Sequence, residues 1–183
     1  MDKGDAKVNV LISQDEINER LDSLAKEIAA DVTGEVMVVS LLKGSFMFTA
    51  DLIRALHNNG VKAQVDFITL SSYGKGMSSS GTITVNRDLS EDVTGKTVLI
   101  VDDILESGRT IDFARRLVTG CGAKDVKVAV LLHKPNKLAV EIAADYVGFT
   151  IPDEFVVGYG LDYANYYREL PFVGVMVAGE DAA

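Results

Sequence analysis

The stretch VLIVDDILESGRT, residues 98–110, joins a short apolar run to a turn rich in glycine, serine and threonine. The run Val98–Val101 is typical of a strand that is buried on both faces. The turn after it favours the start of a helix, where backbone N–H groups can hold a phosphate. Asp102, Asp103 and Glu106 bring three carboxylates into the same stretch, and they would repel a phosphate at contact distance. The stretch therefore predicts a site for more than one kind of ligand group.

The residues after the apolar run divide between two such groups. Residues 106–110, Glu-Ser-Gly-Arg-Thr, offer successive backbone N–H groups and two hydroxyls to a phosphate monoester, and Gly108 permits close approach. Asp102 and Asp103 are then left to accept hydrogen bonds from a sugar diol or to hold a hard cation. A phosphorylated, activated ribose satisfies the whole set, because it carries a phosphate, vicinal hydroxyls and a second, metal-binding anion.

Strands and helices alternate along the rest of the chain. A capping-box pair, Ser13 and Glu16, marks the first helix, and apolar residues follow it at helical spacing. The expected helices are 13–28, 45–57 and a third from about 110 to 120, and the expected strands are 36–42, 65–71, 98–101, 126–132 and 145–149, with an exposed hairpin strand at 82–86. This alternation predicts an α/β fold with a mainly parallel sheet flanked by helices on both faces.

Four loops follow the carboxyl ends of these strands, where ligands bind in parallel sheets. They are KGS (43–45), SSYG (71–74), DDILESGRT (102–110) and HKPN (133–136). We expect them to build one site. Residues 71–81, SSYGKGMSSSG, have little to bury, and a long loop of this kind in a compact domain is usually functional or disordered. We therefore predict a lid over the site.

Composition limits the class of protein. The 183 residues, 48% of them hydrophobic, predict a single domain over 1–183, with an ordered core from about 8 to 177 and short tails. The net charge of -9 argues against a nucleic-acid partner, and no apolar run reaches the ~20 residues that span a membrane. A single cysteine, Cys121, and the absence of an apolar leader indicate a cytoplasmic location.

Several familiar motifs are incomplete here. Gly95-Lys96-Thr97 resembles a nucleotide-binding phosphate loop, but that pattern needs a glycine where the chain has Ser90, and it must follow a strand. Phosphorylation-receiver domains begin with an acidic pattern like VLIVDD, whereas here it lies in mid-chain. His57, His133 and one cysteine do not make a convincing zinc site. No Gly-x-Ser-x-Gly motif supports a hydrolase triad.

Residues 98–110 resemble the thirteen-residue signature of phosphoribosyltransferases: four apolar residues, two acids and a Ser/Thr-Gly-x-Thr turn. Four more segments narrow the resemblance to the purine-salvage branch, the hypoxanthine-guanine phosphoribosyltransferases. They are LLKGS (41–45), SSYG (71–74), LLHK (131–134) and VGFTIPDEFVVGYGLDYANYYRELP (147–171). The resemblance implies the type I phosphoribosyltransferase fold, with a small hood formed by the N- and C-terminal segments, and a homodimer or homotetramer.

The resemblance also implies a reaction. The 5-phosphoribosyl group of 5-phosphoribosyl 1-diphosphate (PRPP) is transferred to a 6-oxopurine, hypoxanthine and/or guanine, giving IMP or GMP and diphosphate. Attack at the anomeric carbon is expected to pass through an oxocarbenium-like state. The leaving diphosphate needs Mg²⁺ and cationic side chains. The expected partners are these two small substrates, without nucleic acid or membrane.

Roles for individual residues follow from the same resemblance. The set expected to bind the PRPP phosphate and ribose is Asp102, Asp103, Glu106, Ser107, Gly108, Arg109 and Thr110. The set expected at the diphosphate is Lys43, Gly44 and Arg168, with a non-proline cis peptide at Leu42-Lys43 or Lys43-Gly44. The expected metal-binding carboxylates are Asp102, Asp103 and Asp162, and the expected lid residues are Ser72 and Tyr73.

The purine is expected to meet Lys134, Phe155, Val156 and Asp162. Phe155 would stack on the ring, and Lys134 would donate to the exocyclic O6. Adenine carries an amino donor at that position, so the mismatch can cost as much as ~10⁴-fold in discrimination. Glu106 is the expected catalytic residue, although many purine members have aspartate there, assigned to proton transfer at N7.

Plainer interpretations exist for some of these residues. Lys134 stands before a proline, where a lysine is usually exposed, and Phe155 alone would most often belong to the core. Arg168 and Glu169 could form a surface ion pair, and Tyr159 could serve packing or a subunit interface. Two other functions also stay open. One is a phosphoribosyltransferase for xanthine or a pyrimidine, and the other is a non-catalytic, PRPP-sensing regulator of the same fold that binds nucleic acid.

Overall fold

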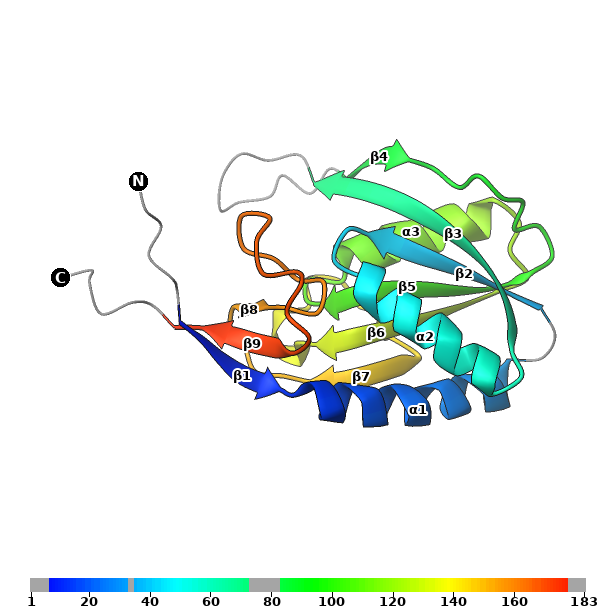
Figure 1. The fold of residues 1–183 in the computed structure, drawn as a ribbon. Helices are drawn as coiled ribbons and strands as arrows, with labels where there is room; N and C mark the ends of the chain where they lie inside the picture. The colour runs from blue at the N-terminus through cyan, green and yellow to red at the C-terminus, as the bar shows by residue number, and fades with distance from the viewer. Residues whose placement is uncertain (1–6, 33–34, 73–82, 178–183) are drawn as a thin grey trace.

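The computed structural model describes residues 7–32, 35–72 and 83–177 (Figure 1). The main sheet has six strands in the order β4-β3-β2-β5-β6-β7. These strands are β2 (Glu35–Leu42), β3 (Lys62–Ser72), β4 (Ile83–Arg87), β5 (Thr97–Leu105), β6 (Asp125–His133) and β7 (Tyr146–Thr150). Only β4 runs antiparallel to its neighbour, so the sheet is mainly parallel, as the sequence predicts.

Helix α1 (Gln14–Asp31) precedes β2, α2 (Phe46–Asn58) connects β2 to β3, and α3 (Arg109–Gly120) connects β5 to β6. A short 3-10 helix, η1, covers Pro135–Lys137. The capping box of α1 is present, because the Ser13 Oγ accepts from the Glu16 N–H at 3.3 Å and the Ser13 N–H donates to the Glu16 carboxylate at 2.8 Å. No helix in the described ranges has the length and hydropathy to cross a membrane.

The main sheet separates two apolar cores. Alternate residues of β2 and β5 face opposite sides of the sheet. Because both sides are buried, the sequences of both strands are continuous apolar runs. One face packs against α1 and α2 through Val36, Val38, Leu99 and Val101. The other face packs against α3 through Met37, Val39, Val98 and Ile100. In Figure 1, α2 crosses in front of the sheet and α3 lies behind it, which confirms helices on both faces.

A second, three-stranded sheet lies beside the carboxyl ends of the main strands (Figure 1). Its order is β1-β9-β8, and both pairings are antiparallel. The strands are β1 (Val8–Ile12), β8 (Val156–Val157) and β9 (Val173–Met176). This sheet is the expected hood, because it joins the N-terminal and C-terminal segments. Sequence analysis did not locate its strands, which are too short to show a clear period.

The end of β5 differs from the prediction. The strand was expected to stop at Val101, but it runs to Leu105, so Asp102 and Asp103 lie in a strand and not in a turn. Pairing with β6 continues past the acids, at Ile104 with Leu132 and at Leu105 with His133. The apolar side chain of Leu105 is buried and extends the strand beyond the acids. The two acids are therefore held by regular sheet structure.

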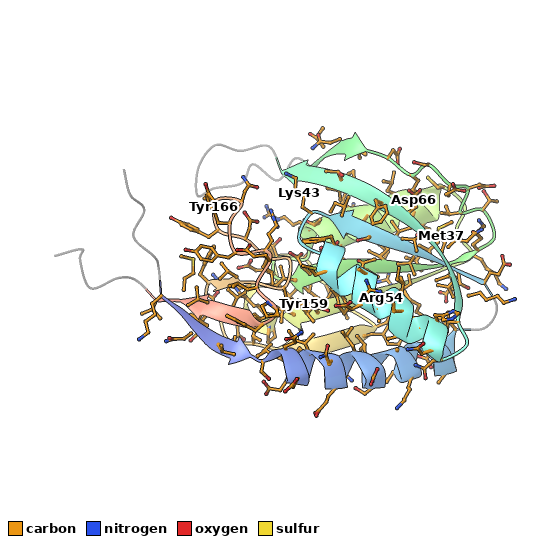
Figure 2. All side chains as sticks on the ribbon, in the orientation of Figure 1. Met37, Lys43, Arg54, Asp66, Tyr159 and Tyr166 are labelled. Carbon is orange, nitrogen blue, oxygen red and sulfur yellow. The ribbon has the colours of Figure 1, made fainter. Side chains whose placement is uncertain are left out.

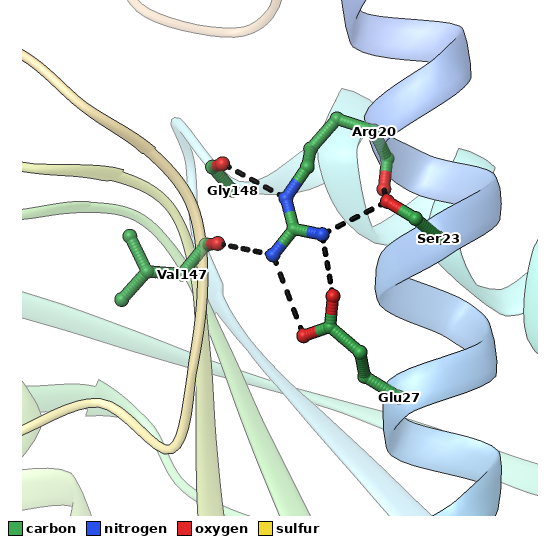
Figure 3. Close-up of polar contacts among 5 residues, drawn as sticks. All are labelled: Arg20, Ser23, Glu27, Val147 and Gly148. Atoms are coloured by element: carbon green, nitrogen blue, oxygen red, sulfur yellow. Dashed lines mark hydrogen bonds and ion pairs between the residues drawn. The ribbon is translucent and has the colours of Figure 1, made fainter.

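Arg20 ties α1 to the edge strand β7 (Figure 3). Its Nε donates to the Gly148 carbonyl at 3.0 Å and its Nη2 to the Val147 carbonyl at 2.7 Å. Its Nη1 donates to the Ser23 hydroxyl at 2.8 Å and to the Glu27 carboxylate at 2.6 Å. One guanidinium thus satisfies two carbonyls of the edge strand while it is fixed by its own helix.

Replacing Arg20 with methionine is expected to lower the free energy of unfolding by about 1–3 kcal/mol, because two strand carbonyls lose charged donors. Arg116→Met is the matched control. Arg116 pairs with Asp112 on the exposed side of α3, and such a pair contributes under ~1 kcal/mol. Urea denaturation of both variants measures the difference. Equal losses would show that the contacts of Arg20 with β7 add nothing beyond a surface ion pair.

Candidate active site

The carboxyl ends of the parallel strands bring the predicted loops to one edge of the sheet. The loop after β2 starts with Lys43, the turn after β5 with Glu106, and the segment after β6 with Lys134. In Figure 2, Lys43 and Tyr166 lie at this edge, above the hood sheet in this view. The loop after β3 falls mainly in 73–82, so the predicted lid residue Tyr73 lies outside the described residues, and Ser72 is the last residue of β3.

The loop after β2 has the predicted non-proline cis peptide, at Leu42-Lys43. A cluster of buried hydroxyls anchors the loop from below. The Ser40 Oγ lies 2.8 Å from the Ser45 Oγ and 2.7 Å from the Thr49 Oγ1. The Lys43 side chain is exposed. The backbone of this loop is thus held by the first turn of α2, and the lysine extends into solvent.

Gly44 brings this loop into contact with the acids of β5. A Cβ built on Gly44 would lie 1.6 Å from the Asp103 Oδ2, so no larger residue fits without displacing that carboxylate. A Cβ on Gly160 would lie 2.1 Å from the Gly44 carbonyl oxygen. Three segments that are distant in sequence therefore stack in the order Asp103, Gly44, Gly160. Sequence analysis missed Gly160, and its only signal was the GYG in the 147–171 segment.

Asp102 and Asp103 are adjacent acids in a shielded position. Burial raises the pKa of Asp102 well above its usual range, and the neighbouring charge of Asp103 adds to this. Burial also raises the pKa of Asp103, whereas hydrogen bonds from Asp102 and the backbone and the nearby Arg168 charge oppose the rise. The Asp102 carboxylate accepts from the Asp103 N–H at 3.0 Å, and the Asp103 carboxylate accepts from the Ile104 N–H at 3.0 Å. A cation or hydroxyl donors would relieve this repulsion.

Asp102 and Asp103 suit a magnesium ion whose remaining ligands come from the substrate and from water. No group of three potential protein ligands exists within the ranges that the structure describes. Mg²⁺ usually takes one or two carboxylates and completes its shell with water and substrate phosphate oxygens. Asp102 and Asp103 supply such a pair, and Gly44 places the loop after β2, the predicted diphosphate loop, directly against Asp103.

Asp162 and Arg168, both predicted site residues, lie together. The Arg168 Nη2 is 2.6 Å from the Asp162 Oδ1, and its Nη1 donates to the Gly160 carbonyl at 2.6 Å. The other oxygen of Asp162 accepts from the Asn165 N–H at 2.7 Å. The alternative of a surface pair between Arg168 and Glu169 is therefore wrong. Arg168 braces the loop that carries Asp162, the predicted metal ligand that lies outside β5.

The turn that opens α3 is the predicted phosphate site. Gly108 is the N-cap of α3 with φ +78°, and Arg109 and Thr110 begin the helix with exposed side chains. The Ser107 carbonyl accepts from the Ala139 N–H at 2.9 Å, so the segment after η1 braces the turn. The Ser107 hydroxyl lies 3.4 Å from the Arg109 N–H. The helix starts at Arg109 and not after Thr110, which brings both residues into the first turn, where backbone N–H groups do not bond within the helix and can face a ligand.

Lys134 is buried at the base of the site, with 6% of its surface exposed, so the interpretation of a surface lysine is wrong. Its Nζ lies 3.6 Å from the Glu106 carboxylate and 3.7 Å from that of Asp153. Lys137 lies 2.8 Å from the other oxygen of Asp153, and this hydrogen bond lowers the pKa of Asp153. Sequence analysis missed Asp153, although it stands two residues before Phe155 in the most specific segment.

Phe155 is 57% exposed, so it is not a core residue. Its ring meets the ring of Tyr163 edge to face, with centroids 5.8 Å apart and planes at 86°. Val156 follows it as a buried residue of β8. The segment that carries the exposed ring of Phe155 also carries Asp153, a partner of the buried Lys134. Such an aromatic ring and lysine can stack on a planar base and donate to its edge.

Comparison with known proteins defines the class of this protein. Residues 13–164 match the family model described as the phosphoribosyl transferase domain, and the chain belongs to that family. The hypoxanthine phosphoribosyltransferases of Salmonella typhimurium and Escherichia coli are 46% and 43% identical to it over 173 residues, which cover 93% of this chain and 96% of each relative. They place the chain in the hypoxanthine phosphoribosyltransferase branch.

Solved structures agree with this placement. The crystal structure of a hypoxanthine phosphoribosyltransferase from Staphylococcus aureus is similar at a TM-score of 0.88 and 38% identity, over 94% of this chain and 92% of that one. A hypoxanthine-guanine phosphoribosyltransferase from Bacillus anthracis also has a TM-score of 0.88, at 41% identity, over 94% and 100%. The fold class and the family predicted from the sequence are confirmed.

Proposed function

We propose that this enzyme transfers the phosphoribosyl group of PRPP to hypoxanthine or guanine, forming IMP or GMP and diphosphate. The observation that supports this most directly is the stack of Asp103 on Gly44, with the Gly108 turn a few residues away. In this proposal the pair of acids serves the ribose between two backbone sites for anions. A ribose with a phosphate on one side and a diphosphate on the other has the matching order of groups.

Each substrate group has a proposed partner. The amides of residues 107–110 bind the 5'-phosphate at the start of α3. Asp102 and Asp103 accept hydrogen bonds from the ribose hydroxyls. The loop amides at Lys43 and Gly44, with Arg168, bind the diphosphate. Asp102, Asp103 and Asp162 would hold Mg²⁺, which would supply positive charge for the departing diphosphate.

The base is held from three sides. Phe155 stacks on the purine, the Val156 carbonyl accepts from a 2-amino group, and Lys134 donates to O6. Glu106 takes the proton from the purine as the bond to the anomeric carbon forms. The ion pair between Lys134 and Glu106, 3.6 Å apart, places the O6 donor beside the proposed base, so one purine edge can meet both.

The test of this function is a diphosphate-release assay with PRPP and each of hypoxanthine, guanine, xanthine and adenine. We expect kcat/KM for hypoxanthine or guanine to exceed that for adenine by at least ~10²-fold, because Lys134 can only donate. Comparable use of xanthine or a pyrimidine would favour a different base specificity. No purine-dependent release with Mg²⁺ present would favour the non-catalytic regulator.

Removal of the metal is expected to abolish turnover. With excess EDTA we expect diphosphate release to fall to background, and added Mg²⁺ should restore it, because Asp102 and Asp103 alone repel the diphosphate. Asp162→Asn should raise the Mg²⁺ concentration needed for half-maximal rate, whereas Asp125→Asn, at the opposite end of the sheet, should not. Full activity in EDTA would remove the metal from the proposal.

The assembly and the location stay predictions. The expected homodimer or homotetramer can be checked by sedimentation equilibrium. One similar structure comes from work on the C-terminal region, oligomeric state and activity of a hypoxanthine phosphoribosyltransferase from Trypanosoma cruzi, at 37% identity. We propose a cytoplasmic location, the compartment that the single cysteine indicates.

A further inference from the structure

The loop that carries Asp162 packs on the predicted diphosphate loop, with Gly160 against Gly44. Gly160 has φ +102°, and its Cα faces the Gly44 carbonyl so closely that a Cβ would be 2.1 Å away. Both polar backbone groups of Gly160 are used within its own loop. Its N–H donates to the Arg168 carbonyl at 3.0 Å, and its carbonyl accepts from the Arg168 side chain at 2.6 Å. Gly160 therefore contacts Gly44 by close packing.

Tyr159 links the loop of Gly160 to α2. Its side chain is 6% exposed, and its hydroxyl donates to the Asp51 Oδ2 at 2.7 Å. Asp51 lies on α2, the helix that starts directly after the diphosphate loop. The other oxygen of Asp51 pairs with Arg54 of the same helix, so the acceptor is held in place. Figure 2 shows Tyr159 lying toward the helix that carries Arg54.

The backbone at Tyr159 supports a specific role. Tyr159 has φ +49°, a left-handed conformation that bulky residues rarely adopt. Its N–H donates to the Leu170 carbonyl at 2.8 Å, which fixes the turn from the other side. Residues in such conformations persist only where the surroundings determine them, and they cluster at functional sites. The conformation turns the side chain of Tyr159 to α2 while it leaves Gly160 on the diphosphate loop.

We propose that Tyr159 is a positioning residue for PRPP binding. By bonding to Asp51 it presses Gly160 against the Gly44 carbonyl and holds the diphosphate loop in its binding conformation. The inference rests on the proposed function of that loop. A preordered loop loses less conformational entropy when the ligand binds. Once PRPP is bound, the loop is ordered in any case, so the effect falls on affinity and not on turnover.

The chain offers a matched control for the hydrogen bond. Tyr146 is 4% exposed, and its hydroxyl donates to the Asp31 Oδ2 at 3.0 Å. This pair joins the start of β7 to the last residue of α1, at the opposite end of the sheet from the site. Tyr146→Phe therefore removes the same kind of bond from the same kind of environment without touching the diphosphate loop.

The experiment compares Tyr159→Phe with Tyr146→Phe in the Mg²⁺-loaded enzyme. We expect Tyr159→Phe to raise the KM for PRPP about tenfold, the effect of losing one hydrogen bond, with kcat within about twofold of the parent. Tyr146→Phe should leave both constants unchanged. The two variants should have similar Tm values. An unchanged KM in Tyr159→Phe, or equal changes in both variants, would overturn the proposal.

Variants of the acceptor provide a rescue test. Asp51→Asn keeps an acceptor oxygen and should retain a KM for PRPP near that of the parent, whereas Asp51→Leu should match Tyr159→Phe. The double variant Tyr159→Phe/Asp51→Leu should be no worse than either single variant, because the two residues act as one pair. Arg54→Met removes only the ion pair and should leave KM unchanged. Additive effects in the double variant would contradict the coupling.

Direct binding separates this proposal from the function itself. If the parent protein released no diphosphate with any purine, the proposed function would be wrong. Calorimetry with PRPP and Mg²⁺ would still decide the role of Tyr159, since it needs no turnover. About tenfold weaker binding in Tyr159→Phe alone supports the positioning role, and equal binding by both variants overturns it.

Discussion

Replacing Glu106 with glutamine is expected to reduce kcat by ~10²–10⁴, the usual contribution of a positioned acid–base group. Glutamine keeps the length and hydrogen-bonding capacity of the side chain but cannot take a proton. Glu106 lies at the end of β5, and its carboxylate is 3.6 Å from the Lys134 Nζ, so a base that meets Lys134 also comes within its reach. The KM for PRPP should change little, because the loss concerns the proton transfer.

A conservative variant and a control variant test the Glu106 prediction further. Glu106→Asp keeps the charge and shortens the side chain by one methylene, and we expect it to retain most of the turnover. Glu154→Gln removes an exposed carboxylate from the nearby IPDEF segment and should have no effect. Steady-state and single-turnover rates at saturating PRPP measure the differences. If Glu106→Gln turned over like the parent, Glu106 would not be the base.

Replacing Lys134 with methionine is expected to lower kcat/KM for hypoxanthine and guanine by ~10²-fold. The purine O6 would lose a charged donor in a buried position, and two carboxylates, Glu106 and Asp153, would lose their shared cation. Methionine preserves the length and apolar stem of the side chain. Discrimination against adenine should narrow, because the amino group no longer meets a competing donor.

Lys137→Met is the control for the Lys134 variant. Lys137 contacts the same carboxylate of Asp153, at 2.8 Å, but its side chain is exposed. We expect this variant to keep both the rate and the base preference of the parent. The measurement is kcat/KM for hypoxanthine, guanine and adenine with each variant. Equal kinetics of Lys134→Met and the parent would exclude the O6 contact.

Some local features were readable from residue order because they depend on near neighbours. The capping box of Ser13 and Glu16 spans a single turn, and the apolar run at 98–101 marks a strand without any knowledge of its partners. The end of that strand was predicted wrongly, because pairing of Leu105 with β6 depends on a strand that starts twenty residues later. Aspartate residues favour turns, but the pairing of β5 with β6 keeps Asp102 and Asp103 in a strand.

The burial of Lys134 also depends on tertiary contacts and not on near neighbours in the sequence. A lysine before a proline is usually exposed, and only the arrangement of Glu106 and Asp153 around its ammonium group keeps it stable inside the protein. Phe155 shows the reverse, since its residue type alone would favour the core, yet it is exposed beside Tyr163. Burial belongs to the packed chain, so residue type alone predicts it only on average.

The sequence by itself determined the alternation of strands and helices, the family and the loops that carry the chemistry, because these depend on periodicity and on short motifs. Only the tertiary structure decided which loops touch. The stack of Asp103, Gly44 and Gly160 and the bond from Tyr159 to Asp51 join segments far apart in the chain. Their contacts arise from the order of strands in the sheet and from glycines without a Cβ, and no local pattern records which distant residue a glycine will meet.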